Sequence, residues 1–211
     1  MQVKPRSSRK ASLYSVHPGV ASVQDWIAAL PQKTGRSLDE WIRLLKKSGP
    51  PSERERLAWL KKEHGLGTNA AGWLARRAEG KGLEDSDPSS YLEAASRYVE
   101  EMYAGPKSTL RPIHDAIVEL CLTLGQDVRI CPCKTIVPLY RKHVFAQIKP
   151  STRTRIDLGF ALANRKATGK LIDTGGYAKK DRITHRIPIA SLADIDAEVK
   201  RWLKTAYDLV Q

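Results

Sequence analysis

The first half of the chain carries apolar residues at the spacing of an α-helix. In one stretch the residues that would share a helix face are Leu38, Trp41, Ile42 and Leu45. Serine and glutamate three residues apart form a capping box, in which each side chain bonds the backbone amide of the other residue. This pattern occurs at residues 37–40, 52–55 and 90–93. It predicts that three helices begin at these points.

Glycines follow these runs at positions suited to end a helix. A glycine tolerates the left-handed backbone conformation that often closes a helix, and we expect that conformation at Gly49, Gly65 and Gly105. Further helical stretches surround Trp26 and extend from Thr68 to Ala78. The sequence therefore predicts about five short helices before residue 106.

A longer amphipathic helix is predicted at the start of the second half. Its apolar stripe comprises Leu110, Ile113, Ile117, Leu120, Cys121 and Leu124, and Gly125 follows it. The place of Cys121 in this stripe predicts a thiol that acts as a small buried apolar group. A final helix over 192–208, capped by Ser191, would present residues such as Leu203 to the same core.

Between these two helices the hydrophobic period changes to two residues. Val144, Ala146 and Ile148 alternate with Phe145 and Gln147, as half-buried antiparallel strands do. Further strands fit residues 155–162, 128–131, 134–140 and 184–189. The second half therefore predicts an antiparallel sheet flanked by helices. With the small helical bundle before it, the chain is predicted to be an α+β protein.

Changes in composition predict a division into four segments. Residues 1–19 are basic and contain several serines, which indicates a disordered tail. A helical domain follows over 20–80. A stretch rich in Gly, Asp, Ser and Pro then opens a linker and connecting helix over 81–106. The α+β domain covers 107–211.

The charge of the chain is strongly positive. The 211 residues carry a formal net charge of +13 at pH 7, of which residues 1–106 contribute +4 and residues 107–211 contribute +9. A pI near 9.8 favours acidic partners such as nucleic acid or a phosphorylated ligand, although the same charge can serve only to keep a protein soluble. Three cysteines, no run of about 20 apolar residues and no apolar secretory signal predict a cytoplasmic protein without a membrane partner.

Several short motifs resemble known sites but lack essential parts. Cys131-Pro132-Cys133 has neither the second ligand pair of a zinc site nor the spacing of a redox pair, so we expect two cysteines at a strand turn and no metal. Asp173-Thr174-Gly175 matches the tripeptide of aspartic peptidases, but the helical content favours a glycine-rich turn between strands. The motifs of phosphate-binding loops and of common hydrolases are absent from the sequence, and no cofactor is expected.

Residues 56–78 read as a helix, a glycine turn and a second helix, which is the order of a DNA-reading helix-turn-helix. The second helix consists mostly of Ala, Trp and Leu. The side chains in it that could reach bases or phosphates are Asn69, Arg76 and Arg77. This composition favours a helix that packs within a small bundle over one that enters a groove of DNA.

Basic residues of the second half form the main candidate site. Those that would lie on or beside one sheet are Arg141, Lys142, Lys149, Arg153, Arg155 and Arg186. With Tyr140 and Phe145 nearby, such a surface suits single-stranded nucleic acid, because cations follow the phosphates while rings stack on the bases. A small anionic ligand, or a solvated face without a ligand, are the alternatives.

An enzymatic site is the rival hypothesis. It would use His143, Asp157 and His185 on neighbouring strands, since histidine titrates near neutral pH and an aspartate can orient it. Convergence of these three residues in a cleft would favour the enzyme, whereas a flat basic face would favour binding.

Five stretches also resemble a bacterial two-domain family of unknown function. "TGRSLDEWI" and "AWLKKEHGLG" are similar to a short helical domain, and "HVFAQIKP", "HRIPI" and "DIDAEVKRWLKTAYDL" are similar to a C-terminal domain that often follows it. That C-terminal domain is also attached to predicted nucleases and to so-called predicted transport proteins. The resemblance implies two domains but no activity. The sequence as a whole favours a non-enzymatic module that associates with nucleic acid or recognises phosphate.

Overall fold

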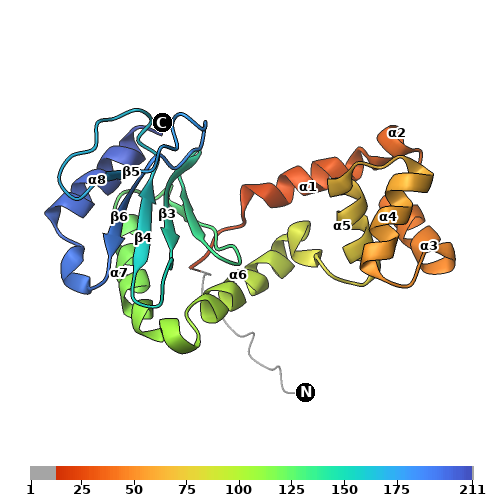
Figure 1. Cartoon of the computed structure of the whole chain (residues 1–211), viewed down its shortest axis with the longest axis horizontal. Coiled ribbons are helices and arrows are strands. Elements are labelled where there is room, and N and C mark those ends of the chain that lie inside the picture. Colours follow the sequence, from red (N-terminus) through yellow and green to blue (C-terminus); the bar gives the residue numbers. More distant parts are fainter. Residues whose placement is uncertain (1–12, 211) are drawn as a thin grey trace, which may run out of the picture. The chain divides into compact units, whose positions relative to one another are not determined.

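Two units make up the part of the chain that the structure describes, which is residues 13–210 of a computed structural model. Val16–Glu93 form the first, which we call the helical unit (Figure 1). The second contains residues 13–15 and 94–210, and we call it the sheet unit. The predicted tail over 1–19 lies mostly outside the described residues, and the first helix begins within it, at Pro18.

Short helices joined by tight turns form the helical unit. Their bounds are α1 Pro18–Ala28, α2 Leu30–Thr34, α3 Leu38–Ser48, α4 Glu53–His64, α5 Thr68–Ala78 and the 3-10 helix η1 Leu83–Asp85. The stretch around Trp26 forms two helices instead of the predicted one, because Pro31 lacks the amide that would continue α1. A longer helix, α6 Pro88–Met102, begins in this unit and ends in the sheet unit. Over residues 13–210, no helix is both long and apolar enough to cross a membrane.

Two of the three predicted capping boxes are confirmed. The Ser37 hydroxyl accepts a hydrogen bond from the Glu40 amide, and the Glu40 carboxylate accepts one from the Ser37 amide at 2.7 Å. Ser52 and Glu55 make the same pair of bonds at the start of α4. These reciprocal bonds satisfy amides that the first turn of a helix leaves without partners.

The third predicted capping box, at residues 90–93, is wrong. Helix α6 begins two residues earlier, and the Asp87 carboxylate accepts a hydrogen bond from the Ser90 amide at 2.7 Å. Pro88 accounts for the earlier start, because its fixed φ and missing amide suit the first position of a helix. Ser90 therefore lies inside the first turn.

The left-handed conformation predicted for three glycines is confirmed at two of them. Gly65 closes α4 with a φ of 65°, and Gly105 has a φ of 58°. At the end of α3 the prediction is wrong, since Gly49 is extended with a φ of −76° and a ψ of 158°. The next residue is Pro50, and a residue that precedes proline is restricted to extended backbone.

The core of the helical unit lies between α3, α4 and α5. Trp41, Leu45, Leu60 and Leu74 are buried there, and the Trp41 indole donates a hydrogen bond to the Thr34 hydroxyl at 2.9 Å. Helix α5 contributes small buried residues to this core. It packs against α3 and α4, as its alanine-rich sequence predicted.

An antiparallel sheet with helices forms the sheet unit, which confirms the α+β prediction. Its helices are α7 Arg111–Leu122, α8 Ala197–Asp208 and the 3-10 helices η2 Gly105–Leu110 and η3 Leu192–Asp194. Its strands are β1 Arg129–Ile130, β2 Val137–Tyr140, β3 Val144–Lys149, β4 Ile156–Phe160, β5 Ile172–Asp173 and β6 His185–Ile189. They lie in the order β1-β2-β3-β4-β6-β5, and each pair of neighbours is antiparallel.

Alternate residues of the central strands point to opposite faces of the sheet. Ile148, Leu158 and Ile187 are cross-strand neighbours on the inner face, where they are buried in one core with α7 and α8. Lys149 pairs with Asp157 on the other face, which we call the outer face. Cys121 is fully buried in the inner core, as its place in the helical stripe predicted.

Strand β3 contains a bulge that the sequence did not reveal. The register between β2 and β3 shifts between Leu139 and Tyr140, which leaves Phe145 as an extra residue. Its ring is fully buried and meets Tyr207 of α8 edge-on, with ring centroids 5.7 Å apart. The hypothesis that Phe145 stacks on bases beside the basic residues is therefore wrong.

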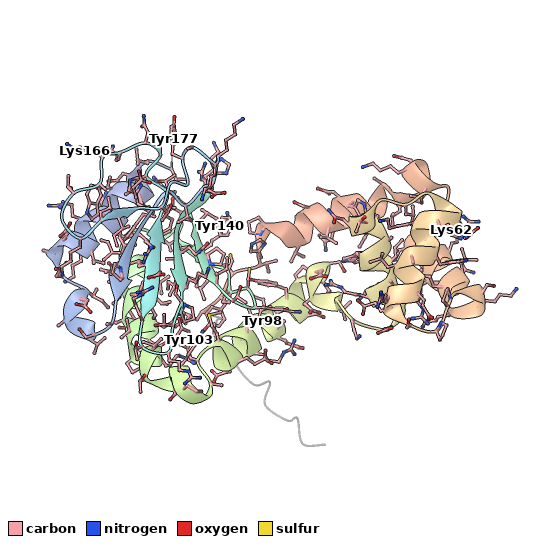
Figure 2. The ribbon with its side chains drawn as sticks, in the orientation of Figure 1. Lys62, Tyr98, Tyr103, Tyr140, Lys166 and Tyr177 are labelled. Atoms are coloured by element: carbon pink, nitrogen blue, oxygen red, sulfur yellow. The ribbon has the colours of Figure 1, made fainter. Side chains whose placement is uncertain are left out.

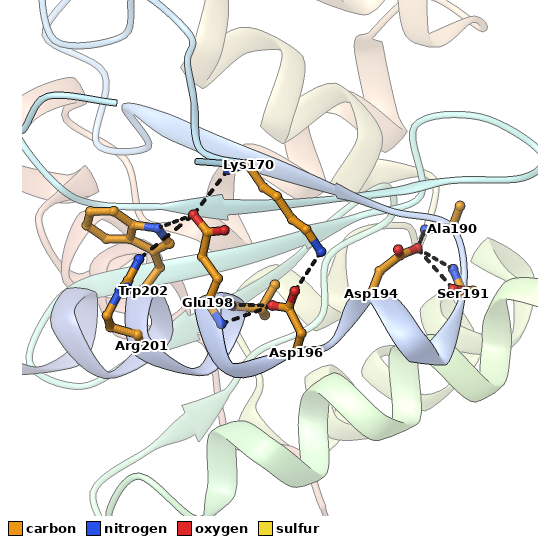
Figure 3. A network of polar contacts seen from close by, with 9 residues as sticks. Lys170, Ala190, Ser191, Asp194, Asp196, Glu198, Arg201 and Trp202 are labelled. Atoms are coloured by element: carbon orange, nitrogen blue, oxygen red, sulfur yellow. Dashed lines mark hydrogen bonds and ion pairs between the residues drawn. The ribbon is translucent and has the colours of Figure 1, made fainter. Parts of the chain in front are cut away.

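The last helix begins later than predicted. Ser191 caps the short η3, and the Asp194 carboxylate accepts a hydrogen bond from the Ser191 amide at 2.8 Å (Figure 3). The backbone at Ile195 then leaves the helical conformation, with a ψ of 62°. Asp196 caps α8 by accepting from two amides of its first turn. Two acidic side chains thus start two separate helices where one was expected.

The connection from β4 to β5 is held against the start of α8. The Lys170 ammonium bonds the Asp196 carboxylate at 2.6 Å, and the Lys170 amide donates to Glu198 at 3.1 Å (Figure 3). The Trp202 indole donates to the same Glu198 oxygen at 3.3 Å. This anchor positions the short edge strand β5, which the sequence had indicated only as a turn.

Candidate anion-binding site

The six predicted basic residues do not gather on one surface. Arg141 and Lys142 lie in the turn between β2 and β3, at one end of the sheet. Lys149 and Arg153 lie where β3 ends and in the loop after it, at the opposite end. Arg155, from the same loop as Arg153, and Arg186 lie beside Asp157, which is the cross-strand partner of Lys149. Each group has a different environment.

Arg141 is engaged by groups of its own unit. Its guanidinium bonds the Asp127 carboxylate at 2.7 Å and lies over the Tyr207 ring, 4.4 Å from the centroid. The bond from the Tyr207 hydroxyl, followed by that from Arg141, holds the pKa of Asp127 below its usual value. Arg141 therefore ties α8 to the loop before β1, while Lys142 beside it is exposed.

Arg155 and Arg186 share one carboxylate. Arg155 forms an ion pair with Asp157 at 3.0 Å, and Arg186 donates a hydrogen bond to the same oxygen at 2.9 Å. Arg186 comes from β6, in register with Gly159 of β4. The acidic side chain offsets part of this positive charge, which weakens the case for an anion site here.

Lys149 and Arg153 line an open pocket of about 520 Å³ together with Lys107 and Lys134. We call it the basic pocket. Lys107 comes from η2, Lys134 from the connection between β1 and β2, and the other two from the end of β3 and the loop after it. Four cations from three separate segments thus meet at one end of the sheet. The hydroxyls of Thr135 and Ser151 also line the pocket.

Backbone contacts fix the segments that carry these cations. The Lys107 ammonium donates to the Pro150 carbonyl at 2.7 Å, which joins η2 to the loop after β3. The Cys133 amide donates to the Ile136 carbonyl at 2.8 Å and closes the turn that holds Lys134. Pro150 is buried, so the loop is anchored next to Lys149. The backbone around the pocket is therefore held in place by contacts within the sheet unit.

The charge inside the basic pocket is largely uncompensated. Among the described residues, Lys134, Lys149 and Arg153 have no ion pair within 4.0 Å. The carboxylate that lines the pocket is Glu101, and it forms an ion pair with Arg97 at 3.7 Å. Like charges that share a pocket repel one another, and a bound anion would remove this repulsion.

The three residues of the enzymatic hypothesis do not converge. His143 is exposed in the turn between β2 and β3. Asp157 pairs with Lys149 on the outer face, whereas His185 pairs with Phe160 at the other end of β4. Because residues three positions apart in a strand point to opposite faces, Asp157 and Phe160 do too. His185 therefore lies on the inner face, away from the Asp157 carboxylate.

His185 is a buried structural residue, 1% exposed. Its Nε2 lies 2.8 Å from the Arg165 carbonyl, which can only accept, so Nε2 carries the proton and donates it. In the neutral ring, Nδ1 then accepts from the Thr184 hydroxyl at 2.8 Å. That hydroxyl oxygen accepts in turn from the Leu162 amide at 3.2 Å. This chain of bonds fixes the segment that follows β4.

Cys131 and Cys133 lie at the turn between β1 and β2. Burial raises the pKa of the Cys131 thiol to about 12, and burial also raises the pKa of Cys133. Thiols with raised pKa values are protonated at neutral pH. In the region from Leu13 to Val210, no cluster of three His, Cys, Asp or Glu side chains could hold a metal ion.

Sequence reasoning found half of the basic pocket. Lys149 and Arg153 belong to the predicted site, but Lys107 and Lys134 were not assigned to it. Lys107 is 42 positions before Lys149 in the chain, and neither periodicity nor composition indicates that η2 folds back onto the β3–β4 loop. The available signal for Lys134 was the six lysines and arginines between residues 134 and 155.

Comparisons with known proteins give families but no activity. Residues 22–80 match a domain of unknown function, DUF4287, and residues 99–210 match a second one, DUF5655. Neither the curated proteins nor the solved structures yielded a significant match. The predicted resemblance to a short helical domain followed by a C-terminal domain of unknown function is confirmed. The second match covers more than half of the chain, which therefore belongs to the DUF5655 family and carries a DUF4287 domain before it.

Proposed function

We propose that the sheet unit is a binding module that recognises phosphate groups in the basic pocket. The observation that carries this proposal is the meeting of Lys107, Lys134, Lys149 and Arg153 around one open pocket with a single carboxylate among its lining residues. Phosphate groups carry negative charge, which would balance the positive charge of these four side chains. Their oxygens also accept hydrogen bonds from ammonium, guanidinium and hydroxyl groups.

The chemistry of the pocket suits a phosphate better than a carboxylate. Three cations come from lysines, which act as point charges around a ligand, and Arg153 adds a planar fork of donors. Thr135 and Ser151 supply hydroxyls for further oxygens. A ligand with several charged oxygens can engage more of these groups at once than a single carboxylate can. Both a small phosphorylated molecule and a nucleic-acid backbone share this chemistry.

Pyrophosphate binding by two matched variants tests the proposal. We expect the full chain to bind inorganic pyrophosphate in calorimetry at low salt, and the double variant Lys149→Ala/Arg153→Ala to bind at least about tenfold more weakly, since each charged bond contributes on the order of 1.5–3 kcal/mol. Lys61→Ala/Lys62→Ala removes the same charge from exposed positions of α4 and should bind like the parent chain.

Two outcomes would overturn the proposal. One is the absence of pyrophosphate binding to the parent chain, and the other is an equal loss of affinity in both double variants. A parallel titration with a single-stranded oligonucleotide separates the two ligand sources. Contacts from three cations predict that the logarithm of its binding constant falls with the logarithm of salt concentration with a slope of about −2. If the pocket recognises a small phosphorylated molecule and not nucleic acid, the chain should bind pyrophosphate but not the oligonucleotide.

A further inference from the structure

A second pocket, of about 660 Å³, lies at the end of the sheet opposite the basic pocket. We call it the tyrosine pocket. Small and aliphatic side chains line part of it, and a rim of polar groups comes from the loop between β5 and β6. Its main lining residues are Ala161, Ala163, Tyr177, Lys180, Arg182 and Leu209. Figure 2 shows Tyr177 projecting from this loop.

Two adjacent glycines give the loop its shape for different reasons. Gly175 has a left-handed backbone with a φ of 69°, which favours glycine. At Gly176 a side chain would have no room, because a Cβ there would lie 2.5 Å from the Ile183 carbonyl oxygen. The Asp173 carboxylate accepts a hydrogen bond from the Gly175 amide at 2.7 Å and fixes the turn. Tyr177 directly follows Gly176, so the two glycines fix the backbone position from which its side chain extends.

Internal hydrogen bonds close the loop at two levels. At its base, the Thr174 amide and hydroxyl both donate to the Thr184 carbonyl, at 3.0 and 2.8 Å. Further out, the Asp181 amide donates to the Gly176 carbonyl at 2.8 Å. These bonds hold the backbone on both sides of Tyr177, so less of the loop has to be ordered when a ligand binds.

Backbone strain is concentrated at this pocket. Among the described residues, the non-glycine residues with a left-handed φ are Ala163, at 54°, and Lys180, at 60°, and both line the pocket. This conformation is costly for residues with a Cβ and persists only where the surroundings impose it. One such constraint is the buried His185, which holds the Arg165 carbonyl just after Ala163. Strained residues of this kind cluster at ligand sites.

The rim of the tyrosine pocket differs chemically from the basic pocket. Arg182 is held by a hydrogen bond from its Nε to the Val144 carbonyl at 3.2 Å, and Lys180 is exposed beside it. Asp181 adds a carboxylate that can accept hydrogen bonds from amino or hydroxyl groups. Tyr177 is 57% exposed and Leu209 is 47% exposed, so both offer apolar surface to a ligand.

We infer that the tyrosine pocket binds a nucleotide. The flat base stacks on the Tyr177 ring and contacts the alanine and leucine side chains, because an aromatic ring offers a stacking surface to any base. The phosphates lie against Lys180 and Arg182. Asp181 accepts from the amino group of the base or from a sugar hydroxyl. This inference is independent of phosphate recognition in the basic pocket, since the two pockets share no residue.

Adenosine diphosphate is the probe that tests this inference, in the background Lys149→Ala/Arg153→Ala so that the basic pocket does not contribute. In that background we expect the nucleotide to bind and pyrophosphate to bind at least tenfold more weakly than the nucleotide. Adding Tyr177→Ala should weaken nucleotide binding about tenfold or more, whereas Tyr177→Phe, which keeps the ring, should bind like its background.

Two results would overturn the inference. One is a nucleotide affinity that Tyr177→Ala does not change, and the other is a background variant that does not bind the nucleotide. Because the Tyr177 side chain is exposed, we expect Tyr177→Ala to fold like its background, and a thermal unfolding curve on each variant checks this. A second variant, Lys180→Ala, should weaken the binding of the nucleotide but not that of adenosine, which has no phosphate. If the parent chain fails to bind pyrophosphate while Tyr177-dependent nucleotide binding remains, the basic-pocket proposal fails and this inference stands.

Discussion

Replacing Phe145 by alanine should destabilise the sheet unit by about 3–5 kcal/mol. The ring is fully buried at the bulge of β3 and meets Tyr207 edge-on at 5.7 Å, so its removal leaves a cavity between the sheet and α8. The loss combines the lost burial of the ring with the lost contacts of its neighbours. Because a domain is stable by only about 5–15 kcal/mol, such a change would remove a large part of the total.

Denaturant unfolding of the full chain measures this effect, with hydrogen exchange of amides in residues 94–210 to follow the sheet unit separately. Tyr177→Ala is the matched control, since it removes an aromatic ring that is 57% exposed and should change the unfolding free energy by less than about 0.5 kcal/mol. A loss below about 1 kcal/mol in Phe145→Ala would contradict the buried position of its ring.

The stability of the sheet unit should fall as the pH drops from 6.5 to 4, and His114 should account for much of that loss. This histidine is 1% exposed in α7, and its Nδ1 lies 3.1 Å from the Tyr103 hydroxyl. Burial lowers the pKa of His114 to about 4. The unfolded chain therefore takes up a proton below pH 6.5, while the folded chain stays neutral until about pH 4. The difference between the two pKa values corresponds to roughly 3 kcal/mol.

An NMR titration of the His114 ring checks the cause, and unfolding curves between pH 4 and pH 7 check the consequence. His114→Gln removes the titrating group, so its stability should depend less on pH across this range even if the variant is less stable throughout. A His114 ring that gains its proton near pH 6.5 in the folded chain would contradict the expectation.

The hydrophobic period predicted the main helices and strands of the sheet unit. The stripe from Leu110 to Leu124 and the alternation around Val144 and Ile156 correspond to α7, β3 and β4. These patterns are local, because each residue reports only on the face of its own element. Features that depend on a partner element were missed. The bulge at Phe145 requires the register of β2, and β5 is a strand only because it pairs with β6.

Boundaries failed where a proline or an acidic side chain competes with the expected cap. Asp87 with Pro88 starts α6 before Ser90, and Asp196 starts α8 after the turn at Ile195. Each competing group could be seen in the sequence, but which of two adjacent caps is used depends on the path of the incoming chain. Helix ends are therefore less predictable from sequence than helix existence.

The candidate site was predictable only as a surplus of charge. The sequence predicts six basic residues on or beside one sheet. In the fold, Arg141 and Lys142 lie at one end of the sheet, and the other four lie at the opposite end and on the outer face. Ion pairs then separate engaged cations from available ones: Arg141 is bound to Asp127, while Lys149 and Arg153 have no such partner among the described residues. Lys107 joins them through a bond to the Pro150 carbonyl, a contact between segments that no local pattern encodes.

An NMR titration of the parent chain with inorganic pyrophosphate tests the central claim most directly, because it locates the ligand. If the basic pocket recognises phosphate, saturable shifts in amide signals should concentrate at Lys107, Lys134–Thr135 and Lys149–Arg153. The amides around Arg141 and in the helical unit should move little. Shifts that do not saturate, or that centre on the turn at Arg141, would contradict the account.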